Sequence, residues 1–463
     1  MPTPGTHDTT PDPARPETDG AAAGAARRSA PDAAAQGGAR GKANRARATR
    51  RQFLLGGAVA GVGAVAAIGL DAMLRRPTDP AAAGGEGGDD GKDGKDGASG
   101  AVRLHGGDTV PFYGAHQAGI ATAPQAHATL VALDLREGVD RGALTRMMRL
   151  LSDDAARLTQ GVPALADSEP ELALAPARLT VTFGFGPGFV ARAGGAAPAW
   201  LAPLPPFTID RLQPEFSGGD LLIQVAADDP LTVSHTARML LKDTRTFASV
   251  RWVQRGFRRA VGSEKAGTTM RNLFGQVDGT VNVRPGTPEF DKVVWTAPTG
   301  TAGAWMAGGT SAVVRRIHMN LDTWDHLDRP GREQSVGRTL ANGAPLTGVH
   351  EHDEPDFEAK TAIGFPVIPE FSHMRRARSD NPDEQIFRRS YNYDDAPTGA
   401  EIAEAGLVFV SFQADVDRQF TPMQRRLDEL DLLNTWTTPV GSAVFAIPPG
   451  CAEGGFVGDT LLA

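Results

Sequence analysis

The chain has 463 residues, a formal net charge of −8 at pH 7 and one cysteine, Cys451. This acidic balance, with few clusters of basic residues, argues against a nucleic-acid-binding protein. A single cysteine excludes intrachain disulfides, so the folded part must be stable through packing alone. The length is enough for two or three domains.

The first 100 residues are not expected to form a packed domain. Residues 1–48 are rich in Ala, Pro, Gly, Thr and Asp, a composition typical of disorder. Arg50 and Arg51 directly precede the charge-free run 53–70, a pattern that predicts a twin-arginine export signal. The alternative is a transmembrane anchor, since the run is about as long as a minimal span. Its five glycines in eighteen residues make it a poor one.

The export signal also predicts a location. We expect the protein to reach the cell envelope or the extracellular space, without a stable membrane anchor. The cleavage site stays open, and the alanines at 81–83 are one option. Residues 84–100 are rich in Gly and Asp, which predicts a flexible linker. The folded part is therefore expected to run from Ala101 to the C-terminus, long enough for one large or two medium domains.

Two apolar runs, 220–229 and 407–416, resemble one another, since each follows a glycine, ends near acidic residues and precedes a helix-like segment. Upstream of each lies a further predicted strand, at 177–186 and 311–322. A helix is predicted at 143–161, where apolar residues recur with a spacing near 3.6. We therefore predict an α+β fold with a duplicated unit, each half an antiparallel sheet with helices on one face. A pocket between such halves is a usual place for a cofactor.

The stretch FGQVDGT (274–280) looks like an ordinary turn. Asp278-Gly279 is a common turn pair, and Gly275 adds conformational freedom. Nothing in the local sequence decides whether Asp278 is a turn residue or a functional carboxylate. Its role depends on the groups that the fold brings near it.

Two later stretches carry candidate groups. His373 stands in the basic stretch FSHMRRARSDNP (371–382), where a lone histidine is more often structural than a ligand. The segment IFRRSYNYD (386–394) has a strand pattern, and strand alternation sends Arg388 and Arg389 to opposite faces. One of the two arginines is therefore expected to point into a pocket.

A histidine, a turn aspartate and a strand arginine match the needs of peroxide chemistry on haem. A neutral imidazole is a strong axial ligand for haem iron. On the opposite face a base must move a proton between the two peroxide oxygens. A fixed cation must stabilise the charge that develops as the O–O bond breaks. Asp278 is the candidate base and Arg388 the candidate cation, and the absence of CxxCH excludes covalent c-type haem attachment.

Gly275-x-x-Asp278-Gly279 is also the signature of the dye-decolourising peroxidases, and further stretches resemble that family in the same order. They are PFYGAHQAGI (111–120), similar to the opening strand and loop of the family's exported branch, SVGRTLANGAPL (335–346), HMRRARSDNP (373–382), FRRSYNY (387–393) and GLVFVSFQADVDRQF (406–420), similar to its last core strand. The signature alone is common by chance, so the resemblance depends on the ordered set. It spans about Val102 to the C-terminus.

The resemblance implies two ferredoxin-like domains with antiparallel sheets, of the dimeric α+β barrel type, at 101–295 and 296–463. It implies non-covalent haem b in a pocket mainly in the second domain, with His373 as the proximal ligand of the iron. Asp278 would be the distal acid–base residue and Arg388 the distal cation. Arg389 is the alternative cation if the register shifts by one.

The resemblance also implies supporting contacts. The family's proximal histidine usually has a carboxylate partner, for which Asp415 is the candidate here. Arg338 is the candidate contact to a haem propionate. Gly275 and Gly279 would let the backbone approach the porphyrin closely. Ser390 departs from the glycine that often follows the paired arginines in the family.

Other residues have simpler interpretations. HEHDEPDFE (350–358) resembles a metal site, but acidic runs that contain proline are mostly solvated loops. His116 is expected to be structural. For the aromatic residues, electron transfer from bulky donors at the surface is an alternative to simple packing; the candidates are Trp324, Tyr391, Tyr393 and Trp436.

The resemblance implies a peroxidase that uses hydrogen peroxide to oxidise dyes, phenols or other bulky organic reductants. The alternative is a haem- and iron-handling protein of the deferrochelatase type, because a sub-branch of the exported family is associated with iron uptake. A haem carrier would need His373 but neither Asp278 nor Arg388, so the three-residue set favours an enzyme. Whether the chain forms a homo-oligomer stays open.

Overall fold

The computed structural model describes residues 104–298, 303–397, 399 and 402–463. The predictions for residues 1–100, namely disorder, export signal, alternative anchor and linker, lie outside the described residues. Within the described ranges, no helix has both the length and the apolar character needed to cross a membrane.

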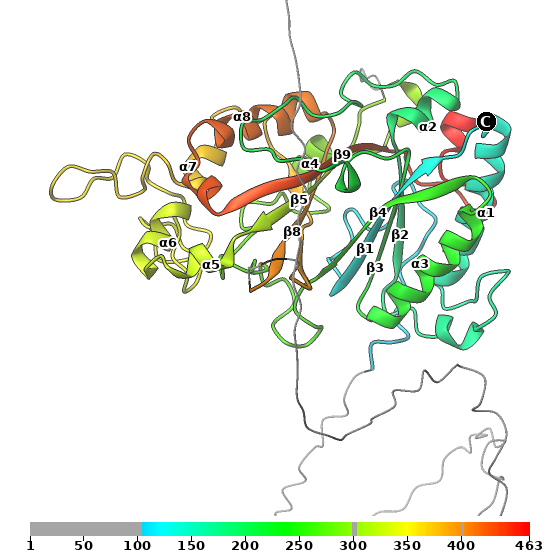
Figure 1. The fold of residues 1–463 in the computed structure, drawn as a ribbon, viewed down its shortest axis with the longest axis horizontal. Helices are drawn as coiled ribbons and strands as arrows, with labels where there is room; N and C mark the ends of the chain where they lie inside the picture. The colour runs from blue at the N-terminus through cyan, green and yellow to red at the C-terminus, as the bar shows by residue number, and fades with distance from the viewer. Residues whose placement is uncertain (1–103, 299–302, 398, 400–401) are drawn as a thin grey trace, which may run out of the picture. The chain divides into compact units, whose positions relative to one another are not determined.

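The first half of the described chain alternates strands and helices (Figure 1). In chain order its elements are β1 (His127–Leu135), α1 (Arg141–Thr159), η1 (Pro170–Ala173), β2 (Thr180–Phe185), α2 (Pro187–Arg192), η2 (Pro214–Phe216), β3 (Leu221–Ala227), α3 (Pro230–Thr244) and β4 (Ala248–Phe257). The predicted helix at 143–161 is confirmed as α1. Its first turn is capped by Asp140, whose Oδ1 accepts a hydrogen bond from Ala143 N at 2.8 Å.

The second half carries more irregular chain between its strands. Its elements are α4 (Pro288–Val294), η3 (Ala304–Met306), β5 (Thr310–Met319), α5 (Leu321–Asp325), α6 (Arg329–Val336), α7 (His373–Ala377), β6 (Phe387–Arg388), β7 (Tyr391–Asp395), β8 (Glu404–Gln413), η4 (Val416–Phe420), α8 (Thr421–Leu430), η5 (Leu432–Thr435), β9 (Thr437–Ile447) and α9 (Asp459–Leu462). The long connection from α6 to β6 contains α7, which begins at His373.

The strands form one antiparallel sheet in the order β5-β9-β2-β3-β1-β4-β7-β8-β6, and β5 also pairs with β8. This last pairing closes the sheet into a ring. If β6 and β7 count as one strand, both halves have the same strand order, second-third-first-fourth. The halves are joined at the pairs Phe185 with Ala446 and Phe257 with Asn392. The predicted α+β class is therefore confirmed.

The predicted equivalence of strands holds for one pair only. The runs 220–229 and 407–416 became β3 and β8, each the third strand of its half. In contrast, 177–186 became β2, a second strand, whereas 311–322 became β5, a first strand. The reason is that the second strand of the second half is the short, interrupted β6–β7 segment. The stretch 111–120, expected to contain an opening strand, has no strand, and the sheet begins with β1.

The inner faces of the two half-sheets pack against each other. Their shared core contains Leu130 and Trp252 from the first half and Val314 and Phe412 from the second. Helices α1 and α3 pack together, and α3 covers β1 and β3 from outside (Figure 1). Helices α7 and α8 pack together near the outer face of β5 and β8, and a pocket lies between these elements.

Two carboxylates meet inside the interface of α1 and α3. Asp154 on α1 is 1% exposed, and it is hydrogen-bonded to Asp243 on α3. Burial, and then the neighbouring Asp154 carboxylate, raise the pKa of Asp243 to about 7. Asp243 Oδ2 is buried without a hydrogen-bond partner. The pair therefore holds a proton in the folded state at mildly acidic pH.

Asp243→Asn is expected to raise the melting temperature more at pH 8 than at pH 5. Above its ordinary pKa, an unfolded aspartate has released the proton that the folded Asp243 still binds. The free energy of unfolding of the native protein therefore falls as pH rises toward about 7, and asparagine removes this loss. Thermal melts at both pH values measure the effect. Asp153→Asn, on the exposed face of the same helix, is the matched control, and equal shifts at both pH values would contradict the prediction.

Candidate functional site

A pocket of about 590 Å³ lies between the second half-sheet, α7, α8 and two loops. Apolar side chains form much of its wall; among them are Ile317 and Met319 on β5, Leu407 and Phe409 on β8, and Met423 and Leu427 on α8. Charged groups gather at other points of the wall; among them are Asp278, Arg315, Arg338, His373, Arg388 and Asp431. The pocket thus combines a largely apolar interior with several ionisable groups, as cofactor sites commonly do.

Asp278 lies at the end of a tight, hydrogen-bonded loop. Asn272 N donates to Gln276 O at 3.0 Å, and Asp278 N donates to Met270 O at 2.8 Å. Gly275 and Gly279 have φ of +78° and +125°, values that other residues rarely adopt. The glycines are therefore explained by the loop itself, whatever lies beside it. The result is a carboxylate that points into the pocket.

Arg388 meets this carboxylate directly. Its Nη1 donates to Asp278 Oδ1 at 2.9 Å, although the two residues are 110 positions apart. The backbone of Arg388 is held on both sides by Asn282, which accepts from Arg388 N at 3.0 Å and donates to Arg388 O at 2.7 Å. The candidate base and the candidate cation are thus brought together on one wall of the pocket.

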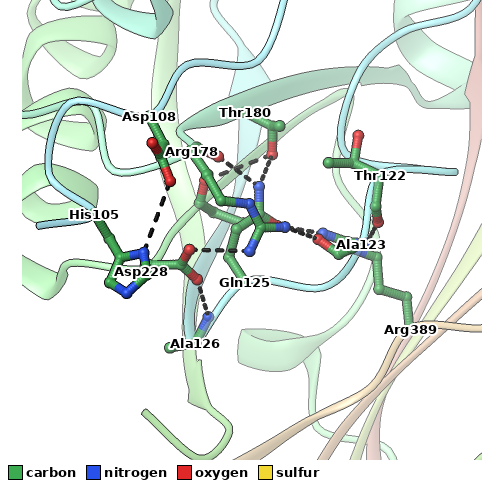
Figure 2. Close-up of polar contacts among 11 residues, drawn as sticks. His105, Asp108, Thr122, Ala123, Gln125, Ala126, Arg178, Thr180, Asp228 and Arg389 are labelled. Atoms are coloured by element: carbon green, nitrogen blue, oxygen red, sulfur yellow. Dashed lines mark hydrogen bonds and ion pairs between the residues drawn. The ribbon is translucent and has the colours of Figure 1, made fainter. Parts of the chain in front are cut away.

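Arg389, the alternative cation, points the other way, as strand alternation predicts. It is fully buried, and its guanidinium donates to Thr122 O and Gln125 Oε1 in the first half of the chain. Figure 2 shows how Gln125 links this guanidinium to the chain around Arg178. The Nε2 of Gln125 donates to Arg178 O at 2.8 Å and to Thr180 Oγ1 at 3.1 Å. Arg389 therefore takes no direct part in the pocket.

His373, the first residue of α7, also lines the pocket. Its Nδ1–H donates to Asp431 Oδ2 at 2.6 Å, and Asp431 is almost fully buried. Burial by itself lowers the pKa of His373, but the attraction of Asp431 and this hydrogen bond outweigh it, so the pKa is raised. Nε2, the other ring nitrogen, is left without a hydrogen-bond partner among the described residues and is available to a ligand in the pocket.

The assignment of Asp415 as the partner of His373 is wrong. Asp415 follows β8 and caps η4, where its Oδ1 accepts from Arg418 N at 3.1 Å. Asp431 takes its place because it ends α8, which packs on α7. The sequence signal for Asp431 was weak, since an aspartate at a helix end before two leucines is usually only a cap.

Arg338 is buried beside the same pocket. Its Nη1 donates to Gly343 O at 2.7 Å and Glu351 O at 2.9 Å, and burial lowers its pKa. It follows Gly337, whose φ of +86° ends α6. The predicted contact of Arg338 to a haem propionate stays a prediction.

The other candidates lie outside this site. His116 Nδ1 donates to Gly308 O at 2.7 Å, and its ring stacks on Trp295 with centroids 3.8 Å apart. Both contacts are structural in kind. In the 350–358 stretch, Asp353 Oδ2 accepts from Val349 N and His350 N and so ties the loop to itself. The part of the chain that the structure describes contains no group of three or more side chains suited to a metal ion.

Most of the aromatic candidates are buried. Trp324, Tyr391 and Tyr393 are each at most 1% exposed, which agrees with simple packing and argues against the alternative that they accept electrons directly from donors at the surface. Trp436 is half-buried and packs edge-on against Trp324, with centroids 5.1 Å apart. Trp324 in turn stacks at 4.3 Å on Phe274, which belongs to the loop of Asp278.

The comparisons with known proteins agree on one family. The family models for the N-terminal and C-terminal parts of Dyp-type peroxidases match residues 117–258 and 269–452. A dye-decolorizing peroxidase of Thermobifida fusca is 38% identical over 361 residues, 75% of this chain and 84% of the relative. A deferrochelatase of Yersinia pestis is 35% identical over 360 residues, 74% of this chain and 82% of the relative.

A solved structure leads to the same result. The crystal structure of a DyP-type peroxidase from Cellulomonas bogoriensis is 56% identical and superposes with a TM-score of 0.75, covering 78% of this chain and 99% of that one. The resemblance to the dye-decolourising peroxidase family is thereby confirmed. The chain belongs to the Dyp-type peroxidase family, and it is a haem peroxidase.

Proposed function

We propose that the protein binds haem b non-covalently and uses hydrogen peroxide to oxidise dyes, phenols or other bulky organic donors. The observation that carries this proposal is the pairing of Asp278 with Arg388 in the same pocket as the His373–Asp431 pair. We further propose two ferredoxin-like domains, at 101–295 and 296–463, with the haem pocket mainly in the second. The shared strand order of the two halves supports this division.

The residues of the pocket fit a haem. Asp431 engages Nδ1 of His373, so the unshared pair of Nε2 is directed to a ligand. Apolar side chains such as Phe409 and Leu407 suit the porphyrin face. The buried guanidinium of Arg338 suits a propionate. His373 would therefore hold the iron, and Arg338 would orient the ring.

The reaction follows from the positions of these groups. A bound haem would supply the redox-active iron at which peroxide is reduced. Asp278 accepts the proton of the inner peroxide oxygen and returns it to the outer oxygen, which leaves as water. Arg388 donates hydrogen bonds to the oxygen on which negative charge develops as the O–O bond breaks. Asp431 accepts a hydrogen bond from Nδ1–H of His373, which keeps the imidazole electron-rich. Two one-electron donors would supply the two electrons that the reduction of one peroxide to water consumes.

Stopped-flow mixing of the haem-loaded protein with peroxide tests the proposal. We expect a Soret band in the resting protein, a rapid spectral change with peroxide, and bleaching of an anthraquinone dye when both are present. A protein that stays colourless when hemin is added, or that binds haem but does not react with peroxide, would contradict the proposal.

A second candidate function is removal of iron from haem, favoured by the relatives named deferrochelatase. Both functions need the same pocket, so product analysis must separate them. Iron removal would leave protoporphyrin IX, which fluoresces strongly, whereas peroxidase turnover leaves the haem intact. Fluorescence spectra after incubation with haem and reductant, with and without peroxide, distinguish the two.

The twin-arginine export of the chain to the cell envelope or extracellular space is also proposed, from Arg50 and Arg51. The paired change of these arginines to lysine is expected to retain the protein inside the cell. Fractionation of expressing cells measures this. A double variant found outside the cell as much as the native protein would refute the proposed route.

A further inference from the structure

We propose that Arg389 is a positioning residue, which fixes the direction of the neighbouring Arg388 by anchoring their strand to the first half of the chain. The proposal rests on the proposed function, because it concerns the distal cation of that reaction. Arg389 itself does not line the pocket.

The strand that carries both arginines is weakly held by ordinary pairing. It pairs with β8 in two short pieces, β6 and β7, separated by Arg389 and Ser390. Across the gap, Arg389 N still donates to Val410 O at 2.8 Å, so the register continues and adjacent side chains alternate. The two side chains project from opposite faces of the same segment. A rotation of the segment about its own axis would therefore displace both of them, and holding Arg389 in place also holds Arg388.

The side chain of Arg389 holds the segment from the face opposite the pocket. It is fully buried, yet the acceptors of its two terminal nitrogens, Thr122 O and Gln125 Oε1, are both neutral. No carboxylate among the described residues forms an ion pair with it, and its Nε lacks a partner. A buried cation without a carboxylate is expensive, which ties the guanidinium strongly to the few acceptors that it has.

The anchor at the other end is rigid. Gln125 is fully buried and is held by Arg178 O and Thr180 Oγ1 (Figure 2). Ala177 and Arg178 adopt φ of +48° and +60°, uncommon for residues other than glycine. Asp228 supports this backbone, since its Oδ2 pairs with Arg178 Nη1 and its Oδ1 accepts from Ala126 N, both at 3.0 Å.

A further arginine supports the same segment. Arg258 Nε donates to Ser390 O at 2.8 Å, and burial lowers the pKa of Arg258 to about 10. The segment 388–390 is therefore held at three points. Asn282 binds the backbone of Arg388 on the pocket side, Arg258 binds Ser390 O, and the Arg389 side chain binds Thr122 and Gln125 on the opposite side. Only the last of these contacts reaches through to the loop at 122–125.

Arg389→Gln in the haem-loaded protein tests the proposal, with Arg316→Gln as the matched control. Arg316 is also buried in the same sheet, at 5% exposed, where it donates to Gln254, Asp395 and Glu404, but it is not next to Arg388. Both variants are expected to lower the melting temperature. Only Arg389→Gln should weaken fluoride binding to the ferric protein and slow the peroxide reaction, each by about tenfold or more, because both need the distal donor in place. The Soret band should persist.

Arg389→Lys, which keeps the charge, is expected to recover part of the loss. If Arg389→Gln does not fold, Gln125→Leu removes one acceptor from the other side and should give the same fluoride defect. Fluoride affinity in Arg389→Gln equal to that of the native protein, or an equal loss in Arg316→Gln, would overturn the proposal. A native protein that binds fluoride but never reacts with peroxide would instead contradict the proposed function alone.

Discussion

Replacing His373 by alanine is expected to abolish stable haem binding. His373 is the imidazole of the pocket, and its free Nε2 is the atom suited to the iron. Loss of a residue that only hydrogen-bonds to a metal ligand costs up to about 100-fold in affinity, so loss of the ligand itself should lower haem affinity by more than about 100-fold. Titration of the apoprotein with hemin, followed at the Soret band, measures this. Unchanged haem binding in His373→Ala would move the ligand to another residue.

The partner of His373 is tested by a pair of aspartate variants. Asp431→Asn keeps an oxygen for Leu433 N but weakens the acceptor for the imidazole, so haem affinity or the peroxide rate should fall by about tenfold to 100-fold. Asp415→Asn, the partner expected from the resemblance, should change neither by more than about twofold, because its carboxylate caps η4. The reverse pattern would restore Asp415 to that role.

Asp278→Ala is expected to keep the haem and to slow the reaction with peroxide by about 10² or more, as loss of a general base does. The carboxylate accepts a hydrogen bond from Arg388 Nη1 at 2.9 Å, and the loop that carries it is held by its own hydrogen bonds. The substitution should therefore remove the general base and leave the shape of the pocket almost unchanged. Single-turnover mixing with peroxide gives the rate, and the resting spectrum reports whether the haem is retained.

Two further variants complete the experiment on Asp278. Arg388→Leu removes the cation and is expected to cost about 10² to 10³, comparable to loss of an oxyanion donor. Asp380→Ala removes an exposed carboxylate from the same pocket and should have little effect. If Asp278→Ala and Arg388→Leu both react with peroxide as fast as the native protein, the assignment of these two residues is wrong.

Two kinds of sequence information, strand alternation and the resemblance to the family, contributed separately to the assignment of Arg388. For Arg388 and Arg389, strand alternation predicted opposite faces, and this is what the structure has. Which of the two faces the pocket depended on how the strand pairs with β8. The preference for Arg388 came from the ordered family stretches, and its contact with Asp278 agrees with it.

Local patterns alone determined several features of this protein. They were sufficient for the helix at 143–161 and the strands at 220–229 and 407–416, because apolar periodicity and flanking glycines act over a few residues. They also identified the turn of Asp278, whose glycines need positive φ in any surroundings. The three residues now seen in one pocket, Asp278, His373 and Arg388, were all named from such short stretches.

Only the tertiary structure decided which residues meet across the chain. Asp431 rather than Asp415 reaches His373 because α8 packs on α7, and nothing in the sequence near either aspartate encodes that contact. The tyrosines of β7 are buried because a second half-sheet packs over them, although their strand alone would allow an exposed face. Periodicity reports which face of an element is apolar, whereas the identity of a partner depends on packing between segments that lie far apart along the chain.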